Sequence, residues 1–280
     1  MITKEDFHIN TDGSDELLYI DYYLIKDCYG FDGEAAISNI DNFMNYNGHK
    51  YEIGQRNKVA SNFSNLSEKP YYPCLGNSEN GSNGRGVSEQ KFIEILDLFK
   101  EKGDIIALIH GNVFSPVFVY GYGPDLNSDL LIALIVKQIS DYTKKVAKIN
   151  NFDTETESAK SWNPITEDWE TITITLARCN NKNEFHLIVP EDMLTDRLPY
   201  SASDFLSNYW RPKLNAKNEK KGIPEMNKKE FSQWLKDNGY SEHDYLMEVI
   251  EEISYQELVD YMTRSKKRSI INKNKRFDKE

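Results

Sequence analysis

Four segments of the chain carry the apolar patterning of β-strands. In residues 171–176 apolar and hydroxyl side chains alternate strictly, which is typical of a strand with one buried face. An Asn-rich turn at 180–183 leads into a partner at 185–189, and the apolar runs 105–110 and 117–120 indicate a second pair. We therefore expect these four strands to share one sheet.

Helices are predicted to flank these strands. Amphipathic segments at 33–46 and 201–210 each indicate a helix. A longer helix is expected after Asn127 or Ser128 as its N-cap. Because its residues 130–136 are apolar all round, the first turns of that helix should be buried.

Polar stretches mark the expected connections. Residues 151–168 are polar and are expected to form a linker, and the Lys- and Asn-rich residues 213–222 are expected to connect the main domain to the C-terminal region. A short strand is expected earlier in the chain, at 17–21.

The C-terminal region predicts a separate helical unit. Asn227, Ser241 and Ser254 each precede an acidic residue by three positions, the pattern of a capped helix start. The chain is therefore expected to form an α+β main domain at 1–212, with a mixed or antiparallel sheet flanked by helices. A small acidic helical subdomain follows at 223–262.

Positive charge is concentrated at the end of the chain. The net charge is −11, yet residues 263–280 hold eight Lys or Arg against two acidic residues. The acidic body argues against a broad grip on a phosphate backbone, which needs Lys and Arg. The basic tail at 263–280 is expected to be a solvated terminus, with a short nucleic-acid tether as the alternative. The acidic subdomain is expected to pack on the core or to dock on a partner protein.

Composition excludes several classes of protein. Three widely spaced cysteines, Cys28, Cys74 and Cys179, exclude a disulfide scaffold and a self-contained zinc site. No stretch has the roughly 20 apolar residues of a membrane span, and residues 1–8 do not read as a secretory signal. The sequence therefore predicts a cytoplasmic protein without a membrane partner.

A glycine-rich loop at 76–86 precedes an expected amphipathic helix and is the first candidate site. Gly81, Gly84 and Gly86 would free backbone N–H groups to hold a phosphate, and Arg85 would add positive charge. The Lys-Ser/Thr ending of a nucleotide-binding P-loop is absent. A surface loop and a nucleotide-binding loop both remain open.

The most concentrated polar signal is the segment 121–129, which reads Gly-Tyr-Gly-Pro-Asp-Leu-Asn-Ser-Asp. Asp125 and Asp129, four residues apart at a helix start, are expected to hold Mg²⁺ or Mn²⁺ through their oxygens, with Ser128 beside them. A bound metal ion would activate water for attack on a phosphodiester. The alternative is structural, with Ser128 and Asp129 capping the helix.

This segment resembles a motif of an uncharacterised family of bacterial proteins, Gly-Ile-Gly-Pro-Asp-(basic)-Ile-Ser-Asp, which is followed by a helix ending in Tyr-Thr. Further likenesses lie in the same order along the chain, at residues 19–24, 81–86 and 187–190. The family's proline, basic residue and lysine are replaced here by Tyr22, Leu126 and Glu191. The resemblance covers residues 15–210 and implies an association with mobile or anti-phage defence regions, without an established activity.

These features favour a metal-assisted phosphodiester hydrolase, a nuclease-like protein of antiviral defence. The expected catalytic residues are a hydroxyl and three carboxylates: Asp21, Asp125, Ser128 and Asp129. The expected phosphate contacts besides the three glycines are Arg85 and Arg178. Two alternatives stay open: a non-catalytic interaction protein whose acidic body docks on a partner, and a nucleotide-binding sensor that uses the loop at 76–86.

Overall fold

The computed structural model describes most of the chain. The described residues are 2–10, 16–66, 69–75, 93, 96–97, 115–119, 121–178, 184–250 and 252–277. Their elements are, in chain order, β1 (Tyr19–Ile20), the 3₁₀ turn η1 (Tyr22–Leu24), α1 (Gly33–Glu52), α2 (Arg56–Phe63), α5 (Ser115–Phe118), α6 (Pro124–Leu134), α7 (Val136–Asn150), β2 (Asp153–Asn163), β3 (Asp168–Arg178), the 3₁₀ turn η2 (Glu191–Met193), β4 (Leu194–Thr195), α8 (Ala202–Asp204), the π-helix η3 (Phe205–Trp210), α9 (Arg211–Glu219), α10 (Lys228–Asp237), α11 (Glu242–Ile250) and α12 (Tyr255–Phe277).

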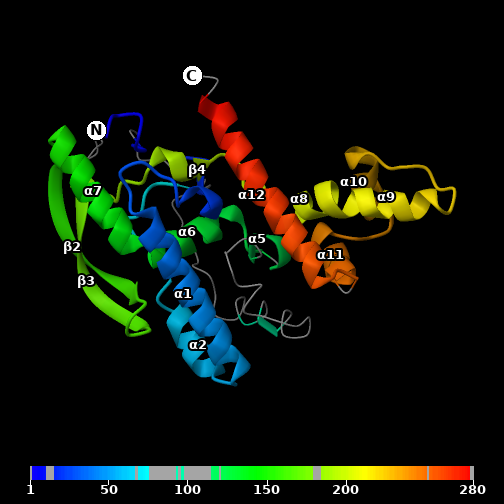
Figure 1. Ribbon diagram of the computed structural model, residues 1–280, viewed down its shortest axis with the longest axis horizontal. Helices are drawn as coiled ribbons and strands as arrows, with labels where there is room; N and C mark the ends of the chain where they lie inside the picture. The colour runs from blue at the N-terminus through cyan, green and yellow to red at the C-terminus, as the bar shows by residue number, and fades with distance from the viewer. Residues whose placement is uncertain are drawn as a thin grey trace.

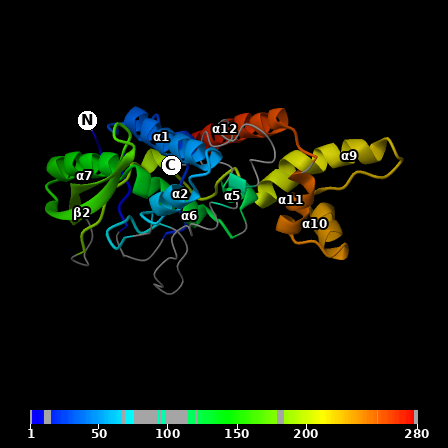
Figure 2. The same ribbon diagram turned by 90° about the horizontal axis from the view of Figure 1, so that it is seen from below.

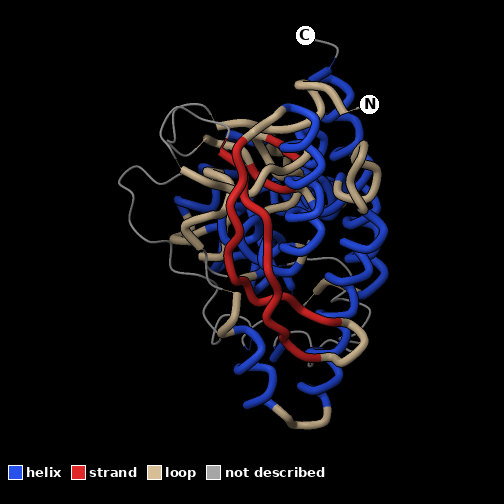
Figure 3. The backbone as a smooth tube through the Cα atoms, turned by 90° about the vertical axis from the view of Figure 1, so that its left-hand side faces the viewer, coloured by secondary structure: helices blue, strands red, loops and turns tan. Residues whose placement is uncertain are grey.

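The fold is α+β, as the sequence predicts, and helices dominate it (Figure 1). α6 lies at its centre, where every residue from Leu130 to Leu134 is buried, and it packs against β1 and α1. α7 packs on the β2–β3 hairpin, which faces the viewer in Figure 3. The molecule is elongated, and α9, α10 and α11 project at the end opposite the hairpin (Figure 2). None of the helices in the described part of the chain combines the length and apolarity needed to cross a bilayer.

Two separate two-stranded antiparallel sheets make up the β-structure of the described residues. β2 pairs with β3 along its whole length, from Asp153 opposite Arg178 to Asn163 opposite Asp168. β1 pairs with β4 through two residues of each strand. The antiparallel pairing agrees with the sequence prediction, but the expected single four-stranded sheet is wrong.

The strand expected at 117–120 is also wrong, because Val117 and Phe118 belong to helix α5. These two side chains expose 1% and 2% of their surface. A short apolar run that is buried all round fits a helix as well as a strand, and periodicity alone does not separate the two. The expected partner at 105–110 lies outside the described residues.

The segment expected to be a linker, 151–168, contains β2 and supplies the main partner of β3. Residues 153–158 are exposed on both faces of the strand, so they lack the alternation that identifies a strand with one buried face. Within the described residues, the partner expected at 185–189 contacts β3 through one bridge, between Ala177 and His186.

The helix expected at 201–210 extends through η3 and α9 to Glu219. The connector expected at 213–222 and the expected end of the main domain therefore fall within one helical run. Buried Asn215 explains why the polar segment is ordered, because its side-chain amide both donates to and accepts from the backbone of Met226 (2.9 and 3.1 Å).

The three helix starts predicted for the C-terminal unit are confirmed. The Asn227 side chain accepts the N–H of Glu230 (3.0 Å), and the Glu230 carboxylate accepts the N–H of Asn227 (2.7 Å). Ser241 and Ser254 make the same reciprocal contacts with the acidic residues three positions on. Each pair satisfies amide groups that would otherwise lack a partner at a helix start.

The basic segment 263–280 is not a solvated terminus in its described part, because α12 continues through it as far as Phe277. Ser265 and Ser269 expose only 0% and 2% of their surface. α12 lies beside η1, and the Tyr23 hydroxyl donates to the carbonyl of Met262 (3.3 Å).

Ion pairs hold α12 against the acidic body. Arg268 lies 2.6 Å from buried Asp204, and Lys273 lies 3.1 Å from Asp192. Composition suggested a free tail because it shows the cations of this segment but not the distant carboxylates that they meet in the fold.

Ending the chain after Thr263 should therefore destabilise the fold strongly. The truncation leaves the buried Asp204 without Arg268, and an uncompensated buried charge of this kind costs about 3–5 kcal/mol, a large part of a typical stability. Urea unfolding followed by circular dichroism measures the loss. Lys266→Ala and Lys275→Ala are the matched controls, because both residues are exposed and each change should stay within about 0.5 kcal/mol. An unchanged unfolding midpoint after truncation would contradict the docked role of α12.

Candidate functional site

The motif at 121–129 forms the start of α6. Gly121 has a φ of 67°, a left-handed conformation that glycine adopts without steric cost, and the helix begins at Pro124, whose fixed φ suits a first helical position. The expectation that Asn127 or Ser128 caps the helix is wrong, since both lie within its first turns and are buried.

Ser128 connects α6 to β1. Its Oγ accepts the N–H of Ile20 (2.9 Å) and donates to the carbonyl of Pro124 (3.1 Å). The side chain exposes 2% of its surface. The hydroxyl expected to take part in catalysis thus holds the strand on the helix.

Asp125 and Asp129 lie one turn apart on α6. Together with burial, the charge of Asp125 raises the pKa of the Tyr19 hydroxyl. Burial and then the charge of Asp129 raise the pKa of Tyr122 well above its ordinary value. Asp125 is half-buried, and Asp129 exposes 8% of its surface. The two carboxylates therefore lie in a partly desolvated region, Asp125 near Tyr19 and Asp129 near Tyr122.

Two polar groups near the start of α6 are buried without a hydrogen bond among the described residues. The side-chain amide of Asn127, which exposes 0% of its surface, has no partner for its nitrogen or its oxygen among the described residues, and neither has the hydroxyl of Tyr122. Buried polar atoms of this kind are rare in folded proteins and call for an explanation such as a bound water or ion.

Asp21 is fully buried at the start of η1. Its Oδ1 accepts hydrogen bonds from the N–H of Tyr23 (3.0 Å) and the hydroxyl of Tyr200 (3.1 Å). Its Oδ2 has no hydrogen-bond partner in the described part of the chain, since the nearby Ser269 hydroxyl donates to Ser265 (3.3 Å). Burial raises the pKa of Asp21 to about 6, although Ser269, Tyr23 and Tyr200 act to lower it.

The predicted site residues do not come together as one metal centre. Among the described residues, no three His, Cys, Asp or Glu side chains are placed to hold a metal ion together. Asp21 therefore does not complete a three-carboxylate cluster with Asp125 and Asp129.

The predicted phosphate contacts lie elsewhere or outside the described residues. Arg178 forms an ion pair with Asp153 at the open end of the hairpin and lies over the ring of Phe185 at 5.7 Å. The glycine-loop residues fall in a part of the chain that the structure does not describe: Gly81, Gly84, Arg85 and Gly86.

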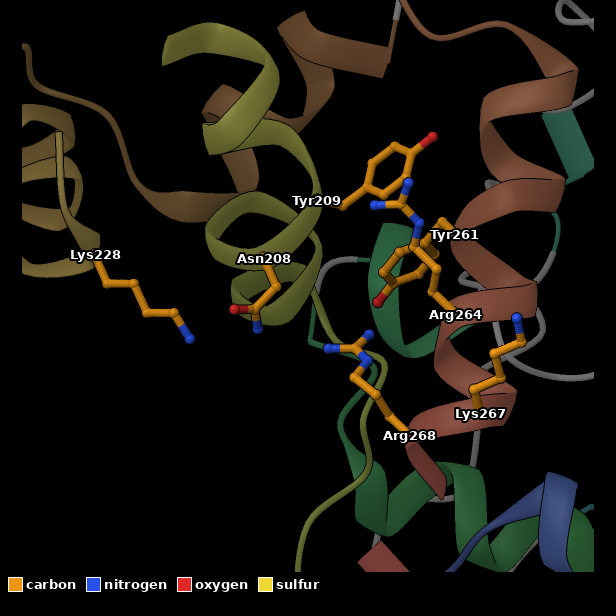
Figure 4. A pocket seen from close by; sticks show the side chains of 7 residues that line it. All are labelled: Asn208, Tyr209, Lys228, Tyr261, Arg264, Lys267 and Arg268. Carbon is orange, nitrogen blue, oxygen red and sulfur yellow. The ribbon is translucent and has the colours of Figure 1, made fainter. Parts of the chain in front are cut away.

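A pocket of about 560 Å³ opens between η3, α10 and α12 (Figure 4). Its lining consists of four cations, two tyrosines and an asparagine: Asn208, Tyr209, Lys228, Tyr261, Arg264, Lys267 and Arg268. Lys228 lies across the pocket from the three cations of α12, and Asn208 lies between them. We call this feature the basic pocket.

Asp204 forms hydrogen bonds with three of the residues that line the basic pocket. Its two oxygens accept from the two terminal nitrogens of Arg268 (2.6 Å each), from the amide of Asn208 (2.6 Å) and from the hydroxyl of Tyr261 (3.2 Å). Burial opposes the charge of Arg268, but the hydrogen bonds and charge of Asp204 outweigh it and raise the pKa of the guanidinium. Three of the residues that line the pocket are thus fixed by one carboxylate.

The remaining cations of the basic pocket carry uncompensated charge. Lys228, Arg264 and Lys267 are exposed, and none has an ion pair with a carboxylate among the described residues. Arg264 lies over the ring of Tyr209 at 5.3 Å, a cation–π contact that orients its guanidinium without neutralising it.

The sequence prediction missed this pocket because it assigned the α12 cations to a tail. Tyr261, Arg264 and Arg268 stand at i, i+3 and i+7, so a helix continued from the Ser254 cap places them on one face. That spacing could have predicted a basic face on a helix at this position. No sequence pattern shows that Asn208 lines the same pocket, because it lies more than fifty positions before these α12 residues.

The chain is thus an α+β protein with a cation-lined pocket and a polar motif at the start of its central helix. It belongs to the family described as "Domain of unknown function (DUF8370)", which matches residues 2–201. Comparison with curated proteins and with solved structures finds no match. The α6 motif lies within the matched region, whereas every residue of the basic pocket lies after it.

Acidification should stabilise the fold through Asp21. Its pKa is about 6 in the fold against an ordinary 3.8, so the folded state binds the proton more tightly than the unfolded chain does. The resulting stabilisation is complete below pH about 4, is lost as the pH rises through about 6, and amounts to about 3 kcal/mol at most. Urea unfolding between pH 4 and 7 should show this dependence in the wild type and not in Asp21→Asn.

Asp141→Asn controls for the loss of an exposed carboxylate. If the wild type and Asp21→Asn change in parallel over this pH range, Asp21 does not hold a proton in the fold as inferred.

Proposed function

We propose that the protein binds nucleic acid through α12, with the basic pocket as the anchor for a phosphate. The observation that carries this proposal is the set of three cations in one pocket, Lys228, Arg264 and Lys267, without an ion pair in the described part of the chain. Cations that meet carboxylates serve the fold, as Arg268 does with Asp204. Cations that converge on a pocket without them favour an anionic ligand.

The charge continues along α12 beyond the pocket. From Tyr261 to Phe277 the helix contains no acidic residue, and Lys266 and Lys275 are also exposed. The end of α12 projects past the body of the molecule (Figure 1). A row of cations on a projecting helix suits an extended polyanion better than a single small anion.

The net charge of −11 restricts this binding to one face. An acidic body repels phosphate elsewhere, so a nucleic acid would contact the molecule at the basic pocket and α12 and would be held by few ion pairs. Such binding weakens as salt is raised, with a slope set by the small number of phosphates neutralised. The resemblance to bacterial proteins of mobile and anti-phage defence regions agrees with a nucleic-acid ligand.

Oligonucleotide binding tests the proposal. Arg264→Gln and Lys267→Gln should each weaken binding of single-stranded DNA about fivefold at 0.1 M salt, because each removes one phosphate contact. Each should also lower the slope of log affinity against log salt by about 0.7. Fluorescence anisotropy over a salt series measures both quantities. Lys137→Gln, an exposed lysine of α7, is the control and should bind as the wild type does. Wild-type affinity in both pocket variants would refute the proposal.

Metal-assisted cleavage of a phosphodiester is a second candidate function, centred on the start of α6. The observation that favours it is the Tyr122 hydroxyl, which is buried without a hydrogen bond among the described residues and lies near the carboxylate of Asp129. Carboxylate and amide oxygens are suitable ligands for Mg²⁺ or Mn²⁺. Such an ion supplies an activated water molecule and stabilises charge on the phosphate. Asp125 and Asp129, one turn apart on the same face of α6, would hold it.

A metal titration decides this candidate. If Asp125 and Asp129 hold an ion, Mn²⁺ at a hundred times its dissociation constant should stabilise the wild type by about 2.7 kcal/mol. Asp125→Asn should abolish this gain while the fold without metal persists, and Asp141→Asn should retain it. Thermal unfolding with and without Mn²⁺ measures the difference. A flat metal response in the wild type would rule out the hydrolase.

A further inference from the structure

The basic pocket is an open hollow between helices, and three of its cations, Lys228, Arg264 and Lys267, are exposed at its surface. Three elements that are distant in sequence form its walls: η3, the start of α10, and α12. Its volume of about 560 Å³ lies in the range that holds a small organic ligand. Lys228 faces the α12 cations across the pocket (Figure 4), so a ligand that enters has positive charge on both sides.

The charge of the pocket exceeds what an internal phosphodiester supplies. Arg268 is neutralised by Asp204, which leaves Lys228, Arg264 and Lys267 as the charges that face a ligand. An internal phosphodiester of a nucleic acid carries one negative charge, whereas a phosphomonoester carries about −1.5 to −2 at pH 7. A terminal phosphate together with its neighbouring diester matches the three cations.

Asn208 adds a hydrogen-bond acceptor to this cationic pocket. Its Nδ2 donates to Asp204 (2.6 Å), which fixes the amide and leaves Oδ1 without a donor among the described residues. A carbonyl oxygen repels the oxygens of a phosphate dianion but accepts from a hydroxyl. At a phosphorylated strand end the sugar hydroxyl that satisfies it is the 2′-hydroxyl of RNA, because the terminal deoxyribose of DNA has both of its hydroxyls esterified.

The tyrosines of the pocket do not offer a stacking surface. Tyr209 and Tyr261 expose only 3% and 1% of their surface, and both rings are already covered by side chains of α12. Recognition of a base by stacking needs an exposed ring face. The pocket therefore presents groups for phosphate and sugar and none for a base.

From these observations we infer that the basic pocket binds the phosphorylated end of a nucleic-acid strand, independently of its sequence. This inference rests on the proposed nucleic-acid binding and narrows it to strand ends. In it, Lys228, Arg264 and Lys267 surround the terminal phosphate, and Asn208 accepts from the 2′-hydroxyl of the terminal nucleotide when the strand is RNA. The exposed cations further along α12 contact the diesters that follow.

The test compares oligonucleotides that differ only at their ends. The full-length protein is titrated into one single-stranded DNA sequence with an internal fluorophore, prepared with a 5′-phosphate, with a 3′-phosphate, or with hydroxyl groups at both ends. At least one phosphorylated form should bind about tenfold more tightly than the hydroxyl form, because of its extra charge-assisted contacts. Equal affinities of all three would overturn the inference while leaving the proposed function in place, whereas no binding of any form would refute both.

Two variants separate the pocket from the rest of α12. Lys228→Gln should bring the phosphorylated DNA down to the affinity of the hydroxyl form, and this exposed position at the start of α10 tolerates the change without loss of the fold. Lys275→Gln should weaken all forms alike and preserve their ratio. A ratio that survives Lys228→Gln would overturn the assignment of the pocket.

Comparison of RNA with DNA tests the sugar contact. A phosphorylated RNA should bind about fivefold more tightly than the phosphorylated DNA of the same sequence, because only the RNA supplies a 2′-hydroxyl for Asn208. Equal affinities of the two would overturn the role of Asn208.

Discussion

The pairing of Arg268 with Asp204 is the contact on which the C-terminal half of the structure depends. The carboxylate is buried at the end of α8, and both of its oxygens accept from the guanidinium of α12. A bidentate pair of this kind fixes direction as well as distance. It sets the position of α12 along the body, and through Asn208 and Tyr261 it also sets the shape of the basic pocket. Removal of one partner from a buried ion pair costs several kcal/mol, whereas the intact pair adds little stability over a well-packed apolar pair. This contact therefore specifies the arrangement more than it adds stability.

The same contact explains how a protein of net charge −11 presents a basic surface. α12 uses Arg268 and Lys273 to neutralise carboxylates of the body, at Asp204 and Asp192, and buries Ser265 and Ser269 on its inner face. Small polar side chains allow the helix to approach η1 closely. Four other cations of the helix are exposed: Arg264, Lys266, Lys267 and Lys275. The cations that are clustered in the sequence are thus divided between two faces of α12, one paired with carboxylates of the body and one exposed.

Local signals predicted most elements, although the short apolar run at 117–120 and the cap expected at Asn127 or Ser128 were wrong. Contacts between distant segments could not be predicted. The cap at Asn227 and the alternating strand at 171–176 could be predicted because each depends on a few neighbouring residues. β2 could not, because residues 153–158 are exposed on both faces and carry no period. The α6 motif was located correctly as a helix start, but the use of the Ser128 hydroxyl by the N–H of Ile20 could not be predicted, since it joins residues more than a hundred positions apart.

The two candidate sites belong to different parts of the chain, and this separation bears on what each implies. The α6 motif lies inside the region that defines the family, so a metal site there would be a property to seek in other members. The basic pocket is made by η3, α10 and α12, all beyond residue 201. α12 contacts the family region through the ion pair of Lys273 with Asp192. Loss of nucleic-acid binding and loss of a metal response would therefore be separable by substitution, because no residue argued for one site serves the other.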